Sequence, residues 1–355
     1  KGTTELAFAV KRLSPNALPD SLSGRPAYEI GVAADGKTVE ARTLSADGNP
    51  SGRPATEIAL AYELRPGEEP HRLVVYFVGE DGALEPVRHS AYDAETGAIR
   101  FNPQRFGIFA VGYSEESFRD LSEAPWAQAM IESLAARAIV QGTGGGQFAP
   151  GKEVTRAEFV QLLMSALGMA DESASSQLRD VNPASWYYAA VASGQRFGIV
   201  QGKPDGTFGA NETMTRQDMA VMLARAAAIA GGLPSAESRP NGGVVPEAGS
   251  LPRGSSPSDS GGPSNGSSPS DSGGQSDNRD HSNSSDPSSN GGPSAAFTDL
   301  DDVASYAAEA VAEMRRVGLI NGFPNGSFQP KQPATRAQAA AMIYKLLNMQ
   351  RVVLI

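Results

Sequence analysis

The chain has 355 residues, a formal net charge of −10 and no cysteine. Without cysteine, disulfides, thiolate metal sites and cysteine nucleophiles are excluded. The acidic balance and the lack of a basic stripe argue against nucleic acid as the main partner. No apolar run is long enough to span a membrane. The length allows two or three domains, and the start at Lys1 suggests a fragment or processed chain whose export signal lay upstream.

Residues 1–113 have the pattern of an antiparallel β domain. Turn sequences such as ADGK, RPGEEP and AETG separate short strand-like runs at 6–10, 56–64, 72–78 and 107–113. This spacing is typical of a β-sandwich. Apolar residues alternate within the run TEIALAYEL, as expected for a strand with one buried face. We therefore expect a sandwich-like domain, whose role the sequence does not indicate.

An internal repeat of helical units follows. Phe118 of the first unit aligns with Leu178 of the second, and a third unit starts at Phe297. Each unit has an Xaa-Asp pair, an aromatic residue that begins helix one, a tight turn, a phenylalanine and a Thr-Arg pair that begins helix two. Helix two has an apolar stripe of period 3.6 in each copy. Repetition of this kind indicates units that bury their apolar faces against each other.

A segment of different composition, residues 233–294, separates the second and third units. It is rich in Gly, Ser, Pro, Asp and Asn and contains GSSPSDSGG twice. Because it offers almost nothing apolar to bury, the sequence predicts a disordered linker. Closing a loop of this length costs about 3–4 kcal/mol, which a good helix interface can offset. We therefore expect the third unit to pack on the first two.

The start of helix two contains an arginine that helix physics does not explain. The segments are VTRAEF, MTRQDM and ATRAQA, beginning at positions 154, 214 and 334. Threonine with an acid or amide three residues later is a capping box. An arginine between them faces the positive end of the helix dipole. It would, however, suit an anion bound at the helix N-terminus, because a guanidinium matches a carboxylate with two parallel donors.

These units resemble S-layer homology (SLH) domains, whose hallmark is an ITRAE-like motif after a G-x-x-D-G-x-F turn. The resemblance covers 117–170, 177–231 and 296–349, and residues 1–113 lie outside it. It implies a multidomain α+β chain in which three SLH repeats pack against each other as an all-α pseudo-threefold bundle. It also implies an extracellular position at the cell surface, and non-covalent anchoring to the cell wall by binding secondary cell wall polymer, often pyruvylated.

The resemblance places glycan contacts at the aspartate, the aromatic residue, the turn lysine and the arginine of the units. The residues are Asp120, Trp126, Arg156, Asp180, Trp186, Lys203, Arg216, Asp299, Tyr306 and Arg336. Structural alternatives stay open for each type. The arginines could form salt bridges to the aspartates of a neighbouring unit, the tryptophans could pack between units, and the aspartates could cap helices or turns. Unit two keeps every landmark, so we expect the principal pocket at its junction with a neighbour.

No cofactor, metal site or catalytic site is expected in this chain. Only three histidines occur, none in a metal or nucleophile motif, and no calcium loop of the required spacing is present. Two other functions stay open beside anchoring. One is a wall-bound polysaccharide-degrading enzyme whose catalytic domain lies upstream of Lys1. The other is a self-assembling subunit of a surface layer.

Overall fold

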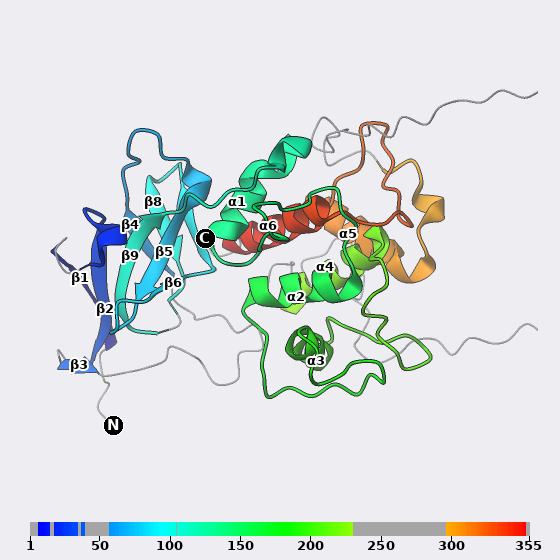
Figure 1. Cartoon of the computed structure of the whole chain (residues 1–355), viewed down its shortest axis with the longest axis horizontal. Helices are drawn as coiled ribbons and strands as arrows, with labels where there is room; N and C mark the ends of the chain where they lie inside the picture. The colour runs from blue at the N-terminus through cyan, green and yellow to red at the C-terminus, as the bar shows by residue number, and fades with distance from the viewer. Residues whose placement is uncertain are drawn as a thin grey trace, which may run out of the picture.

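A computed structural model describes residues 6–14, 18–34, 37–39, 57–103, 105–229 and 296–352 (Figure 1). It has antiparallel sheets in the first part of the chain and helices in the rest, so the expected α+β class is confirmed. The predicted linker at 233–294 lies outside the described residues. Among the described residues, no helix combines the length and apolar composition needed to cross a bilayer.

The β region forms two antiparallel sheets. The larger sheet has the order β1-β2-β9-β5-β6, with β3 paired to β2, and the smaller has the order β4-β8-β7. The strands are β1 (Leu6–Arg12), β2 (Ala27–Ala34), β3 (Lys37–Val39), β4 (Ile58–Ala61), β5 (Leu73–Val78), β6 (Leu84–Pro86), β7 (Ser90–Asp93), β8 (Ala98–Phe101) and β9 (Gly107–Tyr113). All strand pairs are antiparallel.

One apolar cluster lies between the two sheets. Leu60, Ile99 and Phe101 of the smaller sheet pack against residues of the larger sheet, including Leu73 and Phe109. The Phe101 and Phe109 rings are 5.2 Å apart between centroids. This cluster contains only residues of the β region, which therefore has its own core.

Six α-helices, two in each unit, are the main elements of the described helical units. They are α1 (Gln128–Ala136), α2 (Arg156–Leu167), α3 (Tyr188–Arg196), α4 (Arg216–Ile229), α5 (Ala308–Arg316) and α6 (Arg336–Val352). Short 3-10 turns contain two of the aromatic residues expected to begin helix one, at Pro125–Ala127 and Ser305–Ala307. The predicted capping box is present in α2, where Thr155 accepts from the Glu158 N–H and the Glu158 carboxylate accepts from the Thr155 N–H.

Helix one ends in left-handed backbone in all three units. Gly198 and Gly318 have φ of 72° and 74°, and Ala138 has φ of 52° at the same place in unit one. Unit one thus has alanine where the other units have glycine, but the backbone at Ala138 has the same left-handed conformation. A side chain in this region costs about 1–2 kcal/mol, so Ala138 is strained.

The three units share one apolar core and are joined in a closed ring. The helix-two stripes, which include Phe159, Met219 and Ile343, belong to a single buried cluster. At the centre, the Val154 N–H donates to Ala334 (2.9 Å), the Ala334 N–H donates to Met214 (2.8 Å), and the Met214 N–H donates to Val154 (2.9 Å). Each of these residues immediately precedes the threonine that caps helix two. The ring thus fixes the three Thr-Arg pairs relative to one another.

Helix α1 also contacts the β region (Figure 1). Arg137, just after α1, is buried, and its guanidinium donates to the carbonyls of Ser90 (2.7 Å), Leu73 (3.1 Å) and His71 (3.3 Å). Burial lowers the pKa of Arg137 to about 10. Because these carbonyls belong to the β region, the arginine joins that region to the first helical unit.

A buried carboxylate makes the second link of this junction. Glu132 of α1 forms an ion pair with Arg72 (2.7 Å), and its carboxylate contacts His71 at 2.9 Å and Ser117 at 2.7 Å. Burial by itself would raise the pKa of Glu132, but hydrogen bonds from His71, Ser117, Gln128 and Arg72 outweigh it and hold the pKa below its usual value. The Glu132 carboxylate is therefore buried, ionised and paired with groups of the β region at this junction.

Candidate functional site

Arg216 lies inside the ring and contacts backbone carbonyls of unit three. Its Nε donates to the Phe328 carbonyl at 2.7 Å and a terminal nitrogen donates to the Asn321 carbonyl at 3.0 Å. The guanidinium carbon is 4.8 Å from the ring centroids of both Phe323 and Phe328. Only 2% of the residue is exposed. Burial lowers its pKa to about 10, against the attraction of Asp299, which raises it.

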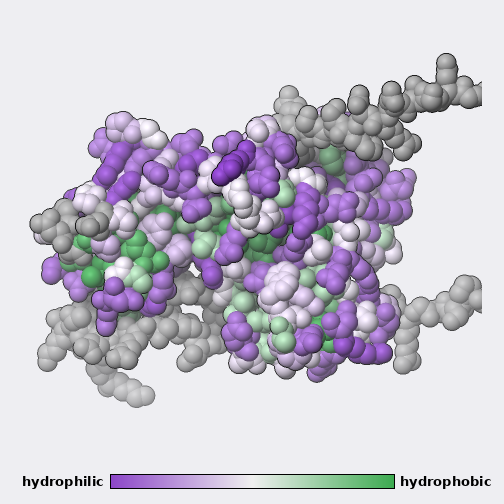
Figure 2. Space-filling model, in the orientation of Figure 1, coloured by the Kyte–Doolittle hydropathy of each residue, from purple (hydrophilic) through white to green (hydrophobic). Residues whose placement is uncertain are grey.

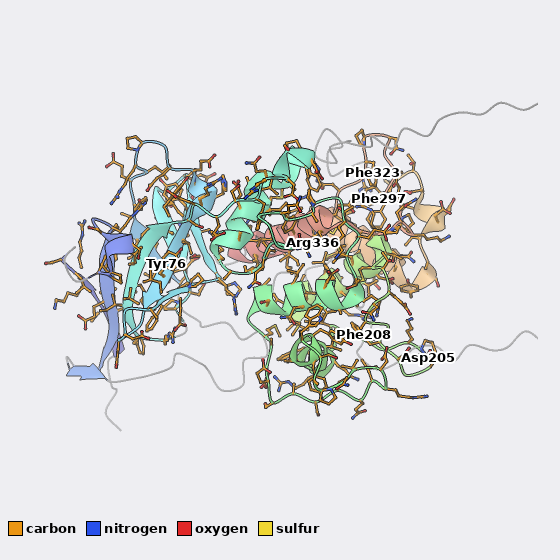
Figure 3. All side chains as sticks on the ribbon, in the orientation of Figure 1. Tyr76, Asp205, Phe208, Phe297, Phe323 and Arg336 are labelled. Carbon is orange, nitrogen blue, oxygen red and sulfur yellow. The ribbon has the colours of Figure 1, made fainter. Side chains whose placement is uncertain are left out.

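Arg336 makes the same contacts to unit one, in the middle of the bundle (Figure 3). It donates to the Phe148 carbonyl at 3.0 Å and to the Gln141 carbonyl at 3.2 Å, and it is 8% exposed. Arg156 donates to the Phe208 carbonyl of unit two at 3.0 Å, and no second carbonyl contact joins it to the described part of that unit. Arg156 is only half-buried. Arg156 therefore makes fewer contacts within the ring than Arg216 and Arg336 do.

The first turn of each helix two is also bonded to the neighbouring unit. The N–H groups of Arg156 and Ala157 donate to the carbonyls of Glu212 and Ala210. The equivalent groups of α4 donate to Gln332 and Pro330, and those of α6 to Lys152 and Pro150. The expected free N–H groups at these helix starts are thus occupied by protein carbonyls. An anion at any of the three would have to be held chiefly by side chains.

The three aspartates hold the turn that carries the phenylalanine. Asp120 accepts from the N–H groups of Phe148 (2.8 Å) and Ala149 (2.7 Å). Asp180 and Asp299 accept from the equivalent pairs of unit two and unit three, at 2.6–2.8 Å and 2.7 Å. Burial alone would raise the pKa of Asp120, but the hydrogen bonds from these backbone donors lower it by more. The pKa is therefore below its usual value. In the described structure no ion pair joins the three arginines to the three aspartates, so that alternative is not observed.

The aromatic residues differ between units. Trp186 is 63% exposed. Tyr306 is 57% exposed, but its hydroxyl donates to Asp218 at 2.7 Å and accepts from Gln217 at 3.0 Å. Burial, followed by the hydrogen bond to Asp218, raises the pKa of Tyr306 to about 12. Trp126 is half-buried and packs against the shared core. Of the three, Trp186 has the most open ring surface.

The two lysines lie at different junctions: Lys203 at that of units one and two, and Lys152 at that of units one and three, where its carbonyl accepts from the Arg336 N–H. Lys203 is paired with Glu212, whose carbonyl accepts from the Arg156 N–H. Lys152 forms an ion pair with Glu158 at 3.4 Å. The structure therefore brings Arg156 and Lys203 to one junction. Glycan contact by the aspartates, aromatic residues, lysine and arginines of the units stays a prediction.

One group of described residues could offer three ligand atoms to a metal ion. Glu69, His71 and Glu132 have donor atoms within 4.8 Å of one another. These residues belong to the junction between the β region and α1, not to the ring. A cation there would compete with Arg72 for the Glu132 carboxylate. The group is accounted for as part of the junction's ion-pair network.

The class of protein follows from the repeated units: a ring of two-helix modules attached to a β domain. The family model of the S-layer homology domain matches residues 117–160, 177–220 and 296–340. The chain therefore carries three S-layer homology domains. Such domains imply cell-wall anchoring, and they indicate a location at the outer cell surface.

The relatives are enzymes and surface-layer proteins. An amylopullulanase of Thermoanaerobacterium thermosulfurigenes is 27% identical over 83% of this chain and 13% of its own length. An exoglucanase, XynX, of Acetivibrio thermocellus is 28% identical over 65% of this chain and 16% of its own. A surface-layer 125 kDa protein of Lysinibacillus sphaericus is 32% identical over 28% of this chain and 8% of its own. The chain thus spans less than a fifth of each of these relatives.

Proposed function

We propose that this chain anchors an exported protein to the bacterial cell wall by binding secondary wall polymer at the junction between units one and two. The proposed bundle is pseudo-threefold, with one junction between each pair of units. The single observation that carries the choice of junction is the state of the arginine. Arg216 and Arg336 each donate to two carbonyls and are buried, whereas Arg156 donates to one and is half-buried.

The aromatic residues support the same junction. In the alignment of the units, Trp186 corresponds to Tyr306, and α2 packs on α3 as α4 packs on α5. The Tyr306 hydroxyl is tied to the first turn of α4, while the indole of Trp186 is largely exposed. An exposed aromatic ring and an arginine at one junction suit a sugar that carries a carboxylate. Pyruvate linked to a sugar as a ketal would supply that carboxylate.

Calorimetric titration with pyruvylated and depyruvylated wall polymer tests this function. We expect Arg156→Ala to weaken binding of the pyruvylated polymer by roughly 10- to 150-fold, the value of one charge-assisted contact of about 1.5–3 kcal/mol. Arg196→Ala is the matched control, because it removes the same charge from an exposed site in α3 where the arginine pairs with Asp171. Equal affinity of the wild type for both polymers would reject the carboxylate. Equal losses in both variants would reject a site at this junction.

A second function is favoured by one comparison. The alignment with the amylopullulanase covers more residues than lie between the start of the first S-layer homology domain and the last residue of this sequence. It therefore also includes part of the β region. This supports a sandwich-like β domain that joins a catalytic domain to the wall anchor in a polysaccharide-degrading enzyme. The sequence of the full-length precursor decides between this arrangement and a surface-layer subunit. A hydrolase domain before Lys1 supports the first, and two-dimensional arrays of purified protein support the second.

A further inference from the structure

The β region has a pocket of its own, outside the three S-layer homology domains. Its volume is about 550 Å³, and it lies where the end of β1, the segment before β2 and the segment after β4 meet. Strands β1 and β2 are on the side of the β region away from the helices (Figure 1). The lining of the pocket includes Arg12, Arg25, Tyr28, Tyr62, Glu63 and Arg65. Three arginines in one pocket are unexpected in a chain of net charge −10.

Two side chains of this pocket, Arg25 and Tyr62, are bonded to each other and to the nearby Glu68 carboxylate. Arg25 forms an ion pair with Glu68 and donates to the Tyr62 hydroxyl at 2.6 Å. The Tyr62 hydroxyl in turn donates to Glu68 at 2.8 Å. The side chains of Arg25 and Glu68 are 15% and 7% exposed. Because Glu68 neutralises Arg25, this arginine contributes hydrogen-bonding geometry more than net charge.

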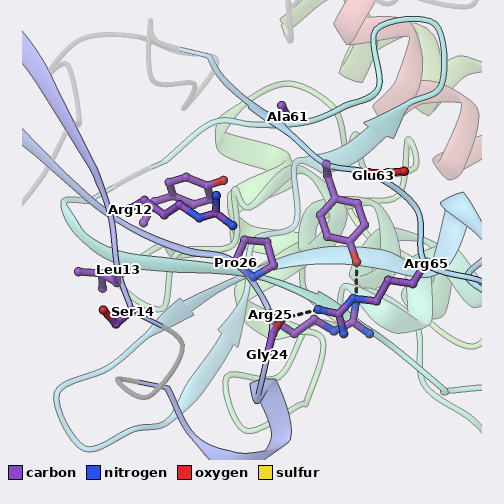
Figure 4. Close-up of a pocket in the computed structure, with 11 residues that line it drawn as sticks. Arg12, Leu13, Ser14, Gly24, Arg25, Pro26, Ala61, Glu63 and Arg65 are labelled. Atoms are coloured by element: carbon purple, nitrogen blue, oxygen red, sulfur yellow. Dashed lines mark hydrogen bonds between the residues drawn. The ribbon is translucent and has the colours of Figure 1, made fainter.

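Arg65 brings a charge that no described carboxylate neutralises. Its guanidinium donates to the Gly24 carbonyl, which is a neutral acceptor. Its backbone N–H donates to Glu68 at 3.0 Å, so the residue is fixed at both ends. Figure 4 shows the guanidinium groups of Arg25 and Arg65 next to each other, with Glu63 directed away from them. Glu68 is the carboxylate next to both residues, and one carboxylate offsets only one of the two guanidinium charges.

Arg12 adds a second charge of this kind. It is exposed at the end of β1, and no ion pair joins it to a carboxylate within the described residues. Its guanidinium lies beside Pro26 in the view of Figure 4, and Tyr28 lines the same pocket. A guanidinium presents a planar fork that matches carboxylate and phosphate oxygens. Tyrosine rings offer flat, amphipathic surface of the kind that a sugar ring covers.

We propose that this pocket binds the acidic group of an anionic saccharide, with Arg65 and Arg12 as the cationic contacts and Tyr28 as the ring that faces the sugar. The shared chemistry is an acidic group on a saccharide or polyol chain, which a uronate carboxylate or a phosphodiester can supply. The location at the cell surface makes both kinds of polymer accessible to the β region. The site does not rest on the proposed binding at the junction between units one and two, because none of its residues belongs to the helical units.

The full chain is titrated with three probes: tri-galacturonate, a trimer of glycerol phosphate, and neutral maltotriose. We expect saturable binding of at least one acidic probe and none of maltotriose. Arg65→Ala and Arg12→Ala should each weaken the acidic probe about tenfold or more, and Arg65→Lys should recover only part of the loss. The probe that binds identifies the acidic group. Arg88→Ala is the matched control, since Arg88 is an exposed arginine of the same β region outside this pocket.

Several outcomes overturn the site. They are no binding of either acidic probe, equal binding of maltotriose, or the same loss in Arg88→Ala as in Arg65→Ala. Thermal melts of each variant separate loss of fold from loss of binding, and Arg12→Ala keeps the test valid if Arg65→Ala is unstable. Arg156→Ala should leave acidic-probe binding at this pocket unchanged. The failure of this site is therefore distinguishable from failure of the proposed anchoring site at the junction between units one and two.

Discussion

Replacing Arg216 by alanine should chiefly destabilise the ring of helical units. Its effect on the affinity for polymer should be smaller. The side chain is 2% exposed and bridges unit two to unit three through two carbonyls. Alanine leaves the buried Phe328 carbonyl without this donor. It also removes the cation that lies 4.8 Å from each of the two phenylalanine rings. The capping threonine and the apolar stripe of α4 stay intact, so the helix itself should form.

The size of the loss follows from two opposing effects. A hydrogen bond to a charged group contributes about 1.5–3 kcal/mol, and two are removed. Against this, a buried guanidinium without an ion pair carries a desolvation penalty that the variant no longer has. The Asn321 carbonyl can also regain water, because Asn321 is exposed. We therefore expect a net loss of about 2–4 kcal/mol, which is a fall in Tm of roughly 4–16 °C for a domain of this size.

The variants Arg216→Ala and Arg156→Ala form a matched pair for thermal melts and polymer titration. The two arginines occupy the same place in successive units but differ in burial and in the number of carbonyl partners. Arg216→Ala should melt early while the folded protein still binds polymer. Arg156→Ala should melt within a few degrees of the wild type and bind weakly. If Arg216→Ala melts like the wild type and loses affinity instead, the reasoning from burial is refuted.

Three further predictions concern stability. Acid should weaken the junction between the β region and α1: the folded pKa of Glu132 is depressed, so its contribution is present above its usual pKa near 4.5 and is lost as pH falls through the lower folded value. Melts of Glu132→Gln between pH 3 and 7 should show a smaller pH dependence than the wild type. Ala138→Gly should raise stability by about 0.5–1 kcal/mol, measured by chemical denaturation, because glycine relieves the left-handed φ of 52°. Cleavage at a protease site inserted within 233–294 should leave both pieces associated in size-exclusion chromatography, because three backbone hydrogen bonds close the ring; separation of the pieces would contradict this.

Features that depend on local sequence could be predicted. The capping box at Thr155 and the apolar stripe of helix two are encoded within a few residues, so the pattern was sufficient. Pairing in the β region was not predictable in the same way. Strand β4 belongs to the sheet of β7 and β8 although β5 is next to it in the chain. Sheet membership depends on contacts between distant segments, and no single strand contains that information.

The junction with the β region left a signal that comparison of the repeats could have found. Glu132 and Arg137 occur only in unit one, where unit two has Ala192 and Phe197 at the aligned positions. A charged pair on one copy of a repeated helix indicates a neighbour that the other copies lack. That neighbour is the β region, whose carbonyls and Arg72 pair with these side chains.

The arginines show why repetition alone does not identify a binding residue. In each unit the aspartate holds the phenylalanine turn through two N–H groups, and the arginine of the preceding unit in the ring binds the phenylalanine carbonyl. Features present in all three copies are therefore explained by closing the ring. Features that differ between copies are not needed for closure, since the ring forms with either version. Two such differences concern the proposed site. Trp186 is exposed whereas Tyr306 is hydrogen-bonded, and Arg156 is half-buried whereas Arg216 is buried. A ligand site in this ring is best sought where the copies diverge.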